Sequence, residues 1–260
     1  MDLLLINPFD ENAVKNGLGV VSPPLNLMYI GGALEEASYI VNIMDDDFEQ
    51  LGYNKICKIL SEEEPQLVGI TTTSSTIKNA LEYAKLVKKI LPHSLTVIGG
   101  PHPTFMPVDI LKTCPELDVV VIGEGEKTMV ELASLSLDKN NGQFNDVNGI
   151  AYRDNGNIKI NPPRELIKDL DSIPFPARHL VPFESYGTTR GKSSDMITSR
   201  GCVYNCSYCS SSRIMGNKFR TRTPGNVVDE IEFLIDEYKL ENIAFMDDNF
   251  MLNKRRANEI

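Results

Sequence analysis

The stretch LVGITTTSSTIKNALEYAKLVKKILPHSLTVIGG, from Leu67 to Gly100, places an amphipathic segment between two short apolar runs. The runs LVGITT and LTVIGG are bounded by turn residues or charge, which is typical of buried strands. Between them, with Ser75 or Thr76 as the N-cap, apolar residues recur at helical spacing: Ile77, Leu81, Ala84, Val87 and Leu91. The stretch therefore predicts a strand, a helix and a second strand parallel to the first.

The same alternation extends through the first half of the chain. Further strands are predicted at Leu3–Asn7, Ile40–Asp45 and Asp118–Gly123. Helices are predicted at Leu25–Ala37, at Tyr53–Glu64, in a short piece after Pro107 and at Glu126–Leu135. Strands that alternate with helices indicate an α/β fold with a doubly wound parallel sheet that is covered on both faces.

Sheets of this kind bind ligands at the carboxyl ends of their strands. Three of these ends lead into Thr71, Thr72, Thr73 and Ser74, into Gly99, Gly100, Pro101 and His102, and into Gly123, Glu124, Gly125 and Glu126. Glycines let a backbone approach a ligand closely, and hydroxyls supply hydrogen bonds. Ordinary βα turns have the same composition, so the residues alone leave both interpretations open.

The pattern changes after Leu137. A polar segment leads into GIAYRDNGNIKI, which predicts a hairpin that turns at Asp154–Asn157. Five prolines then fall between Asn161 and Tyr186, which predicts an extended surface connector and not a core element. We therefore expect a first domain at residues 1–138, a hairpin and proline-rich linker at 139–190, and a second domain at 191–260.

Composition limits the class of protein. The chain has 260 residues, is 42% hydrophobic and carries a formal net charge of −10. It begins MDLLLINPFDEN, without the basic start of a leader peptide, and no apolar run approaches the ~20 residues that span a bilayer. Its basic residues are not interleaved with stacking aromatics. We expect a cytoplasmic protein that binds neither membranes nor nucleic acids.

Three of the five cysteines lie in SRGCVYNCSYCSS, at Cys202, Cys206 and Cys209. A strand is predicted before them at Asp195–Ser199, with a helix from Pro224 and then a second strand after them, so the thiols occupy the first loop of a βαβ unit. A zinc site needs four ligands, for which His179 is a candidate fourth. A cubic iron-sulfur cluster held by three thiolates has one open iron.

The segment around the thiols is basic. Met196–Val228 contains no acidic residue and five basic ones, namely Arg200, Arg213, Lys218, Arg220 and Arg222. This charge predicts a field that favours thiolate over thiol and that offsets an anionic cluster or ligand. The alternative is a solvated basic loop.

The spacing C-x3-C-x2-C, with Tyr208 before the last cysteine, resembles the signature of the radical S-adenosylmethionine superfamily. The segments PPLNLMYIGGALE, GITTTSST, VIGGPHPTFMP, DVVVIGEGEKT, DLDSIPFPAR and FRTRTPGNVVDEI are similar to successive landmarks of its cobalamin-binding-domain subclass. The resemblance covers essentially the whole chain. It implies a Rossmann-like sheet of the cobalamin-binding type, followed by the first βαβ part of a partial TIM barrel.

The resemblance also implies roles for residues. Cys202, Cys206 and Cys209 would hold a [4Fe-4S] cluster whose open iron chelates S-adenosylmethionine, with Tyr208, Asp247 and Asp248 close to that cofactor. Thr71–Thr73, Gly99–His102 and Gly123–Glu126 would line cobalamin. The implied activity is radical methylation or rearrangement of an unknown small-molecule or peptide substrate, served by a reductase or a ferredoxin-type electron donor.

Two departures from the family pattern matter. Domains that ligate cobalt use D-x-H-x-x-G, and the matching segment DFEQLG has Glu49 where the histidine would be. A carboxylate is a poor substitute for imidazole on such metals, so we expect cobalamin bound without a protein imidazole. The chain also ends at Ile260, soon after the second barrel strand, so we expect a fragment of an enzyme. The alternative is a non-catalytic corrinoid-binding module with an incomplete tail.

Overall fold

The computed structural model describes residues 1–10, 22–137, 142–186 and 192–260. Five strands form the parallel part of a seven-stranded sheet: β1 (Leu3–Asn7), β2 (Val41–Asp45), β3 (Leu67–Thr71), β4 (Leu95–Gly99) and β5 (Val119–Val121). Their spatial order is β2-β1-β3-β4-β5, so the chain winds outward in both directions from β1. The predicted doubly wound parallel sheet is confirmed.

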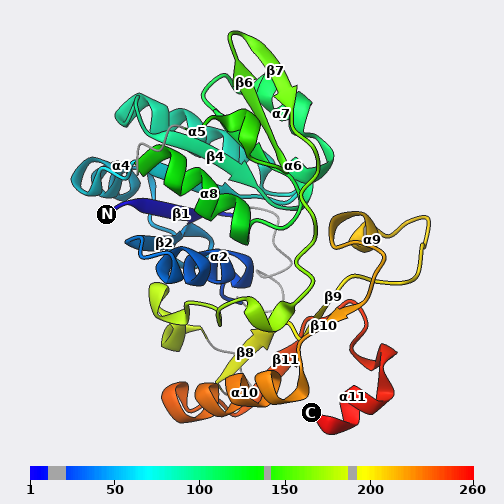
Figure 1. The fold of residues 1–260 in the computed structure, drawn as a ribbon. Helices are drawn as coiled ribbons and strands as arrows, with labels where there is room; N and C mark the ends of the chain where they lie inside the picture. Colours follow the sequence, from blue (N-terminus) through cyan, green and yellow to red (C-terminus); the bar gives the residue numbers. More distant parts are fainter. Residues whose placement is uncertain (11–21, 138–141, 187–191) are drawn as a thin grey trace.

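Helices cover both faces of this sheet (Figure 1). Leu3 and Leu5 of β1 share a core with residues of α2 (Leu25–Glu36) and α8 (Glu126–Leu137). Leu4 and Ile6 share a second core with residues of α4 (Tyr53–Glu63), α5 (Ile77–Ile90) and α7 (Pro107–Thr113). Successive side chains of a strand point to opposite faces, so a strand buried on both sides needs an unbroken apolar run. Two short helices, α3 (Asp46–Glu49) and α6 (Pro101–Phe105), follow β2 and β4.

The predicted hairpin is present and extends the sheet. Strands β6 (Ile150–Asp154) and β7 (Asn157–Ile160) are antiparallel, and β6 pairs with the edge of β5. Asn155 and Gly156 join them with φ of 49° and 84°, the positive values that a type I′ turn requires. The sequence analysis assigns this hairpin to the linker at residues 139–190, not to the first sheet. It is hydrogen-bonded into the first sheet because β5 would otherwise be an open edge strand.

The proline-rich segment is extended, but the prediction that it lies outside the core is wrong. Six of its larger apolar side chains are buried, namely Ile167, Leu170, Ile173, Val181, Phe183 and Tyr186. It is interrupted by three 3₁₀ turns, at Leu170–Ser172, Arg178–Leu180 and Phe183–Ser185. Helix α2 lies close against it, since a Cβ at Gly32 would lie 2.7 Å from the Phe175 carbonyl oxygen. The segment therefore packs under α2 instead of crossing a surface.

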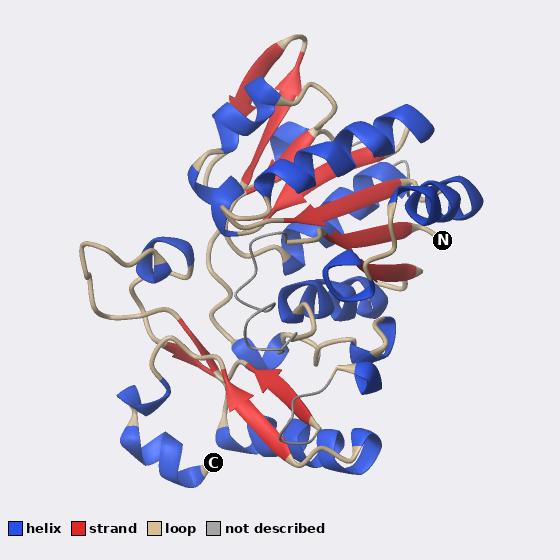
Figure 2. Cartoon of the chain, turned by 180° about the vertical axis from the view of Figure 1, so that it is seen from behind, coloured by secondary structure: helices blue, strands red, loops and turns tan. Residues whose placement is uncertain are grey.

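The C-terminal part forms the predicted βαβ unit. Strands β8 (Ser193–Met196) and β11 (Asn242–Phe245) are parallel and are joined through α10 (Pro224–Tyr238), which begins with the Thr223 side chain as its N-cap. A second pair, β9 (Ser199–Arg200) and β10 (Arg220–Thr221), is antiparallel, with α9 (Ser211–Ile214) between them and α11 (Lys254–Glu259) near the end of the chain. Figure 2 shows these strands set apart from the seven-stranded sheet.

The expected domain boundaries at residues 138 and 190 fall outside the described residues. Across the four described ranges, no helix combines the length and the apolar character needed to cross a membrane.

Candidate functional site

Two loops at the carboxyl edge of the sheet contact each other. Ser74, after β3, has its Oγ 2.9 Å from Nδ1 of His102, after β4. The Thr72 amide donates to the Gly99 carbonyl at 2.9 Å. Gly100 has φ of 110°, and a Cβ there would lie 2.5 Å from the Thr72 carbonyl oxygen, so only glycine permits this approach. The structure thus brings the predicted threonine and glycine loops together.

A small cavity of about 40 Å³ lies below these loops, between the sheet, α2 and α8. Its walls are apolar except at Thr71, and they come from Leu5, Leu27, Ile30, Gly69, Ile70, Thr71, Val97, Gly99, Val121, Gly125 and Met129. A Cβ at Gly69 would lie 2.9 Å from Leu5 Cδ2, and one at Gly125 would lie 3.1 Å from Ile30 Cδ1. The glycines keep this crevice open at the edge where open α/β sheets bind ligands.

The segment after β2 is occupied by α3. Asp45 caps this helix through its side chain, and the buried Asp46 accepts hydrogen bonds from the Leu51 amide, at 2.7 Å, and from the Tyr83 hydroxyl. Burial and the Asp46 carboxylate raise the pKa of Tyr83 well above its usual range. Glu49, at the position of the family's histidine, is exposed. The expectation of cobalamin without a protein imidazole at this position stays a prediction.

The three thiols lie on the loop between β9 and β10, which we call the cysteine loop (residues 201–219). Cys202 is half-buried, Cys206 and Cys209 are exposed, and all three are free of disulfides. The Cys202 amide donates to the Gly216 carbonyl at 3.2 Å, and the Cys209 amide donates to the Cys206 carbonyl at 3.1 Å. Within the described residues no three potential ligands are already gathered around one point. Three accessible thiols on one loop fit iron-sulfur ligation, which takes cysteine thiolates.

His179, the candidate fourth zinc ligand, pairs elsewhere. Its Nε2 lies 2.8 Å from Glu35 Oε1 on α2, and it is not grouped with the thiols in the described part of the chain. The structure therefore lends no support to the zinc alternative.

Asp247 and Asp248 leave β11 toward different partners. Asp247 accepts from the Thr198 hydroxyl at 2.8 Å, from the Thr198 amide at 3.2 Å and from the Ser199 hydroxyl, so it ties β11 to the segment between β8 and β9. Asp248 is exposed and accepts from the Ser211 hydroxyl, two residues beyond Cys209. Tyr208 is 91% exposed. Asp248 is therefore hydrogen-bonded to the cysteine loop, which also carries Tyr208, whereas Asp247 is bonded to the segment that follows β8.

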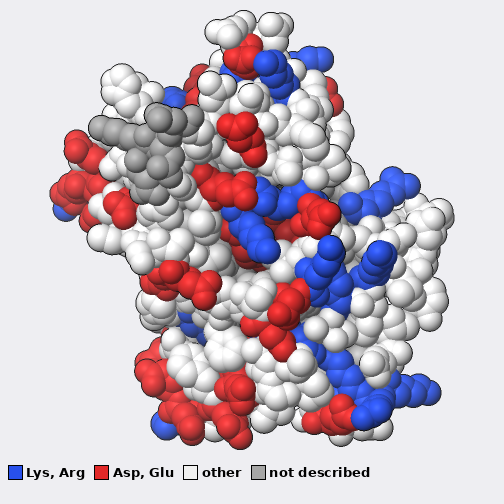
Figure 3. Space-filling view, viewed as in Figure 1, with Lys and Arg blue, Asp and Glu red and all other residues white. Residues whose placement is uncertain are grey.

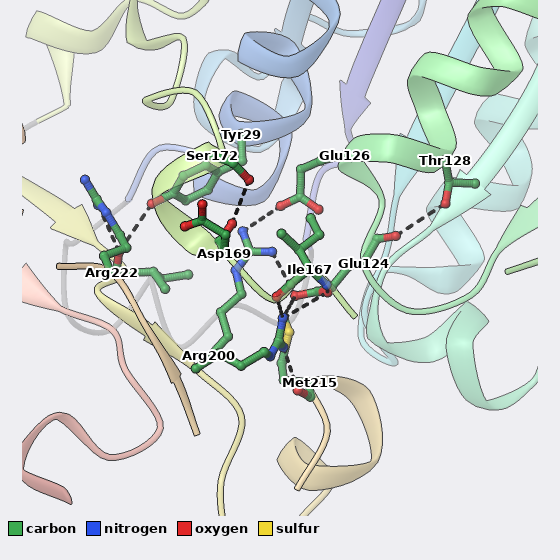
Figure 4. A network of polar contacts seen from close by, with 12 residues as sticks. Tyr29, Glu124, Glu126, Thr128, Ile167, Asp169, Ser172, Arg200, Met215 and Arg222 are labelled. Atoms are coloured by element: carbon green, nitrogen blue, oxygen red, sulfur yellow. Dashed lines mark hydrogen bonds and ion pairs between the residues drawn. The ribbon is translucent and has the colours of Figure 1, made fainter. Parts of the chain in front are cut away.

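A buried ionic network, which the sequence analysis missed, joins the two parts of the chain (Figure 4). Glu124 and Glu126 come from the loop and helix after β5, and Arg200 and Arg220 come from β9 and β10. Arg200 donates to Glu126 at 2.6 Å and to Glu124 at 3.0 Å. Burial opposes the charge of Arg200, but Glu126 and Glu124 outweigh it, so the pKa of this guanidinium is raised. In the sequence, these four residues are marked only by their positions: Glu124 and Glu126 follow a predicted strand, and Arg200 and Arg220 flank the three cysteines.

This network changes the interpretation of the basic segment. Arg200, Arg220 and Arg222 are buried and paired with Glu124, Glu126 or Glu230. Because these carboxylates neutralise their charges, the three arginines do not supply the positive field that the sequence analysis expects around the thiols. Arg213 and Lys218 remain exposed on the cysteine loop itself. In Figure 3 the bulge at the right, where this loop lies, is largely uncharged with basic groups beside it, and acidic groups gather at the lower left over α10. The Glu124 carboxylate, predicted to approach cobalamin, is likewise occupied by arginines.

Comparison with known proteins identifies both parts. Residues 12–133 match the B12 binding domain model, and residues 196–260 match the Radical SAM superfamily model. An uncharacterized methyltransferase of Pyrococcus horikoshii is 39% identical over 260 residues, which are 100% of this chain and 56% of that protein. The cytidylyl-2-hydroxyethylphosphonate methyltransferase of Streptomyces wedmorensis is 32% identical over 99% of this chain and 57% of its own length. The chain thus spans about half the length of these curated relatives.

Two solved structures share the fold. The radical S-adenosylmethionine methyltransferase TsrM of Kitasatospora setae, with cobalamin and a [4Fe-4S] cluster bound, matches 100% of this chain and 50% of its own, with TM-score 0.77 and 21% identity. The cobalamin-dependent enzyme OxsB, with aqua-cobalamin and S-adenosylmethionine bound, matches 100% of this chain and 36% of its own, with TM-score 0.80 and 20% identity. The predicted cofactor set agrees with both domain models and with the ligands of these structures. The chain therefore belongs to the radical S-adenosylmethionine proteins that carry a B12-binding domain.

Proposed function

We propose that this chain binds the [4Fe-4S] cluster and the cobalamin of a radical S-adenosylmethionine methyltransferase. The observation that carries the proposal is the joint placement of two sites. A loop with three accessible thiols is joined, through buried ion pairs, to the carboxyl edge of a sheet of the cobalamin-binding type. Such an arrangement suits a reaction that needs both groups. The relatives quoted above as methyltransferases support methylation as the reaction class.

The residues fit the two groups in different ways. Cys202, Cys206 and Cys209 supply thiolates for three irons, which leaves the fourth for S-adenosylmethionine. Tyr208 and Asp248 would contact that molecule, and Asp247 holds the nearby strand end through Thr198. When bound, the cluster supplies an electron for cleavage of the sulfonium, and cobalamin supplies a methyl group.

The crevice between the sheet, α2 and α8 suits an apolar portion of cobalamin, because glycines at its walls leave the room that a Cβ would fill. Thr71, Thr72 and Thr73 would border cobalamin on one side, and Gly99, Gly100, Pro101 and His102 on the other. Gly123 follows on the next loop. The proposed substrate is a small molecule. One TsrM structure contains tryptophan. A reductase or a ferredoxin-type protein would supply the electron.

Anaerobic reconstitution with iron, sulfide and hydroxocobalamin tests the proposal. We expect about four irons per chain with broad visible absorption, and one cobalamin that co-elutes in gel filtration. The triple variant with Cys202, Cys206 and Cys209 changed to Ala should lose the iron and keep the cobalamin. Cys57→Ala is the matched control, since Cys57 lies on α4, and it should keep both.

Each contrary result has a distinct meaning. Iron retained by the triple variant would refute the assignment of the ligands. Cobalamin without iron in the unaltered chain would favour a corrinoid-binding module, and zinc in place of both would refute the proposed function.

A further inference from the structure

Both ends of the cysteine loop are anchored to a single carboxylate. Arg200 lies immediately before the loop and Arg220 immediately after it, and the two face each other in the β9–β10 ladder. Arg200 Nη1 donates to Glu124 Oε1 at 3.0 Å, and Arg220 Nη1 donates to Oε1 and Oε2 of Glu124 at 2.9 and 3.1 Å. Glu124 belongs to the loop that leaves β5 at the carboxyl edge of the sheet, so it connects that edge to both ends of the cysteine loop.

The charges explain why the ladder depends on this residue. Like charges directly opposite each other on paired strands are destabilising, and Arg200 and Arg220 form such a pair. Their side chains are only 6% and 8% exposed, so water does little to separate the charges. Glu124 contacts both guanidiniums, and Glu126 adds a second carboxylate on Arg200. Without Glu124, the two arginines would still face each other, and Glu126, which contacts only Arg200, would be the one remaining carboxylate of this group.

Other contacts hold Glu124 and the loop in place. The Ile167 amide of the connector donates to Glu124 Oε2 at 2.8 Å, which fixes the carboxylate from a third direction. Arg220 Nη2 donates to the Met215 carbonyl of the cysteine loop at 2.7 Å. Gly201 has φ of 87°, and a Cβ there would lie 2.3 Å from the Lys218 carbonyl oxygen, so the two ends of the loop pack closely. Displacement of Arg220 would therefore move the loop itself.

We propose that Glu124 is a positioning residue that sets the placement of the cysteine loop relative to the carboxyl edge of the sheet. On the proposed function, from which the identity of the two cofactors is taken, it would thereby set the separation between the iron-sulfur cluster and cobalamin. Glu126 reinforces it through Arg200. Neither carboxylate needs to touch a cofactor for this role.

Hydrogen exchange of the unloaded chain, read by mass spectrometry, is the first test. In Glu124→Gln, which keeps the side-chain shape and removes its charge, we expect the amides of β9, β10 and Cys202 to exchange about tenfold faster. The amides of β1 to β5 should be unchanged. Glu131→Gln is the matched control, because Glu131 pairs with Arg164 and not with an arginine of β9 or β10, and is 44% exposed. Unchanged exchange at β9 and β10 in folded Glu124→Gln would overturn the proposal.

A second measurement separates positioning from general stability. In the chain loaded with both cofactors, the reduced cluster should broaden the electron paramagnetic resonance signal of cob(II)alamin to an extent set by their separation. We expect Glu124→Gln to keep its iron but to show an altered broadening at a temperature at which the variant is fully folded, with Glu124→Asp, which retains the charge, closer to wild type. The same broadening in all three proteins would overturn the proposal.

If Glu124→Gln does not fold, Arg220→Lys takes its place in both measurements, with the same expected directions. A wild-type chain that bound neither iron nor cobalamin would refute the proposed function instead. The exchange experiment needs no cofactor, so it would still decide the role of Glu124.

Discussion

Glu230 holds the C-terminal βαβ unit to the connector, and its replacement should be costly. Its carboxylate lies 2.7 Å from Arg178 Nη2, both side chains are 0% exposed, and it also accepts from Arg222 Nη1, whose side chain is 5% exposed. Glu230→Gln keeps the shape and removes the charge, which leaves two buried guanidiniums without their counter-charge. Removal of one partner of a buried ion pair costs about 3–5 kcal/mol, and two arginines depend on this one, so we expect the upper half of that range.

Urea denaturation followed by far-ultraviolet circular dichroism would measure this loss. With a slope of about 2 kcal/mol per molar urea, a loss of about 4 kcal/mol lowers the midpoint by about 2 M. Glu82→Gln is the control for the same chemical change, because the Glu82–Lys85 pair lies on the surface, with side chains 64% and 49% exposed. It should cost less than about 1 kcal/mol. A midpoint for Glu230→Gln equal to that of the control would refute the argument that burial makes this ion pair indispensable.

Three further outcomes follow from the geometry. Gly69→Ala should fold but bind hydroxocobalamin at least about tenfold more weakly, because a Cβ 2.9 Å from Leu5 Cδ2 displaces that side chain into the crevice. Gel filtration with hydroxocobalamin measures the binding, and Gly225→Ala is the control that should bind as the unaltered chain does. At pH 8 an alkylating reagent should modify Cys206 and Cys209 but not Cys114. Burial and the neighbouring Glu116 raise the pKa of the Cys114 thiol to about 11, so this thiol stays protonated at pH 8. Peptide mapping that found Cys114 modified as fast as Cys206 and Cys209 would contradict the prediction. Asp247→Asn should lower the free energy of unfolding by about 1–3 kcal/mol in urea denaturation, because an amide cannot accept hydrogen bonds at both of its terminal atoms as the carboxylate does. Asp248→Asn should be nearly neutral. Equal losses in the two variants would be evidence against the distinct roles assigned to the two residues.

Local features of the sequence were sufficient for the fold class and for the family. The first-half strands follow from runs such as Leu67–Thr72, because a strand buried on both faces must be apolar at every position. The turn of the hairpin follows from Asn155 and Gly156, since few other residues accept positive φ at both positions. The spacing of Cys202, Cys206 and Cys209 indicates the family without any knowledge of the tertiary structure. These signals are encoded within a few residues of one another.

Only the tertiary structure decided which charges and apolar groups are buried together. The sequence shows five basic residues around the thiols, yet three of them are neutralised by acids from other segments, and Arg200 finds Glu124 76 residues away. The connector illustrates the same limit, because its prolines predict an extended backbone but not that α2 would bury the side chains between them. Burial and pairing depend on which distant segments come into contact. The residues next to a charged or apolar side chain in the sequence do not indicate which partner it will contact. The sequence by itself therefore determined the fold class and the family, whereas the folded chain determined that Glu124 serves the arginines beside the cysteine loop.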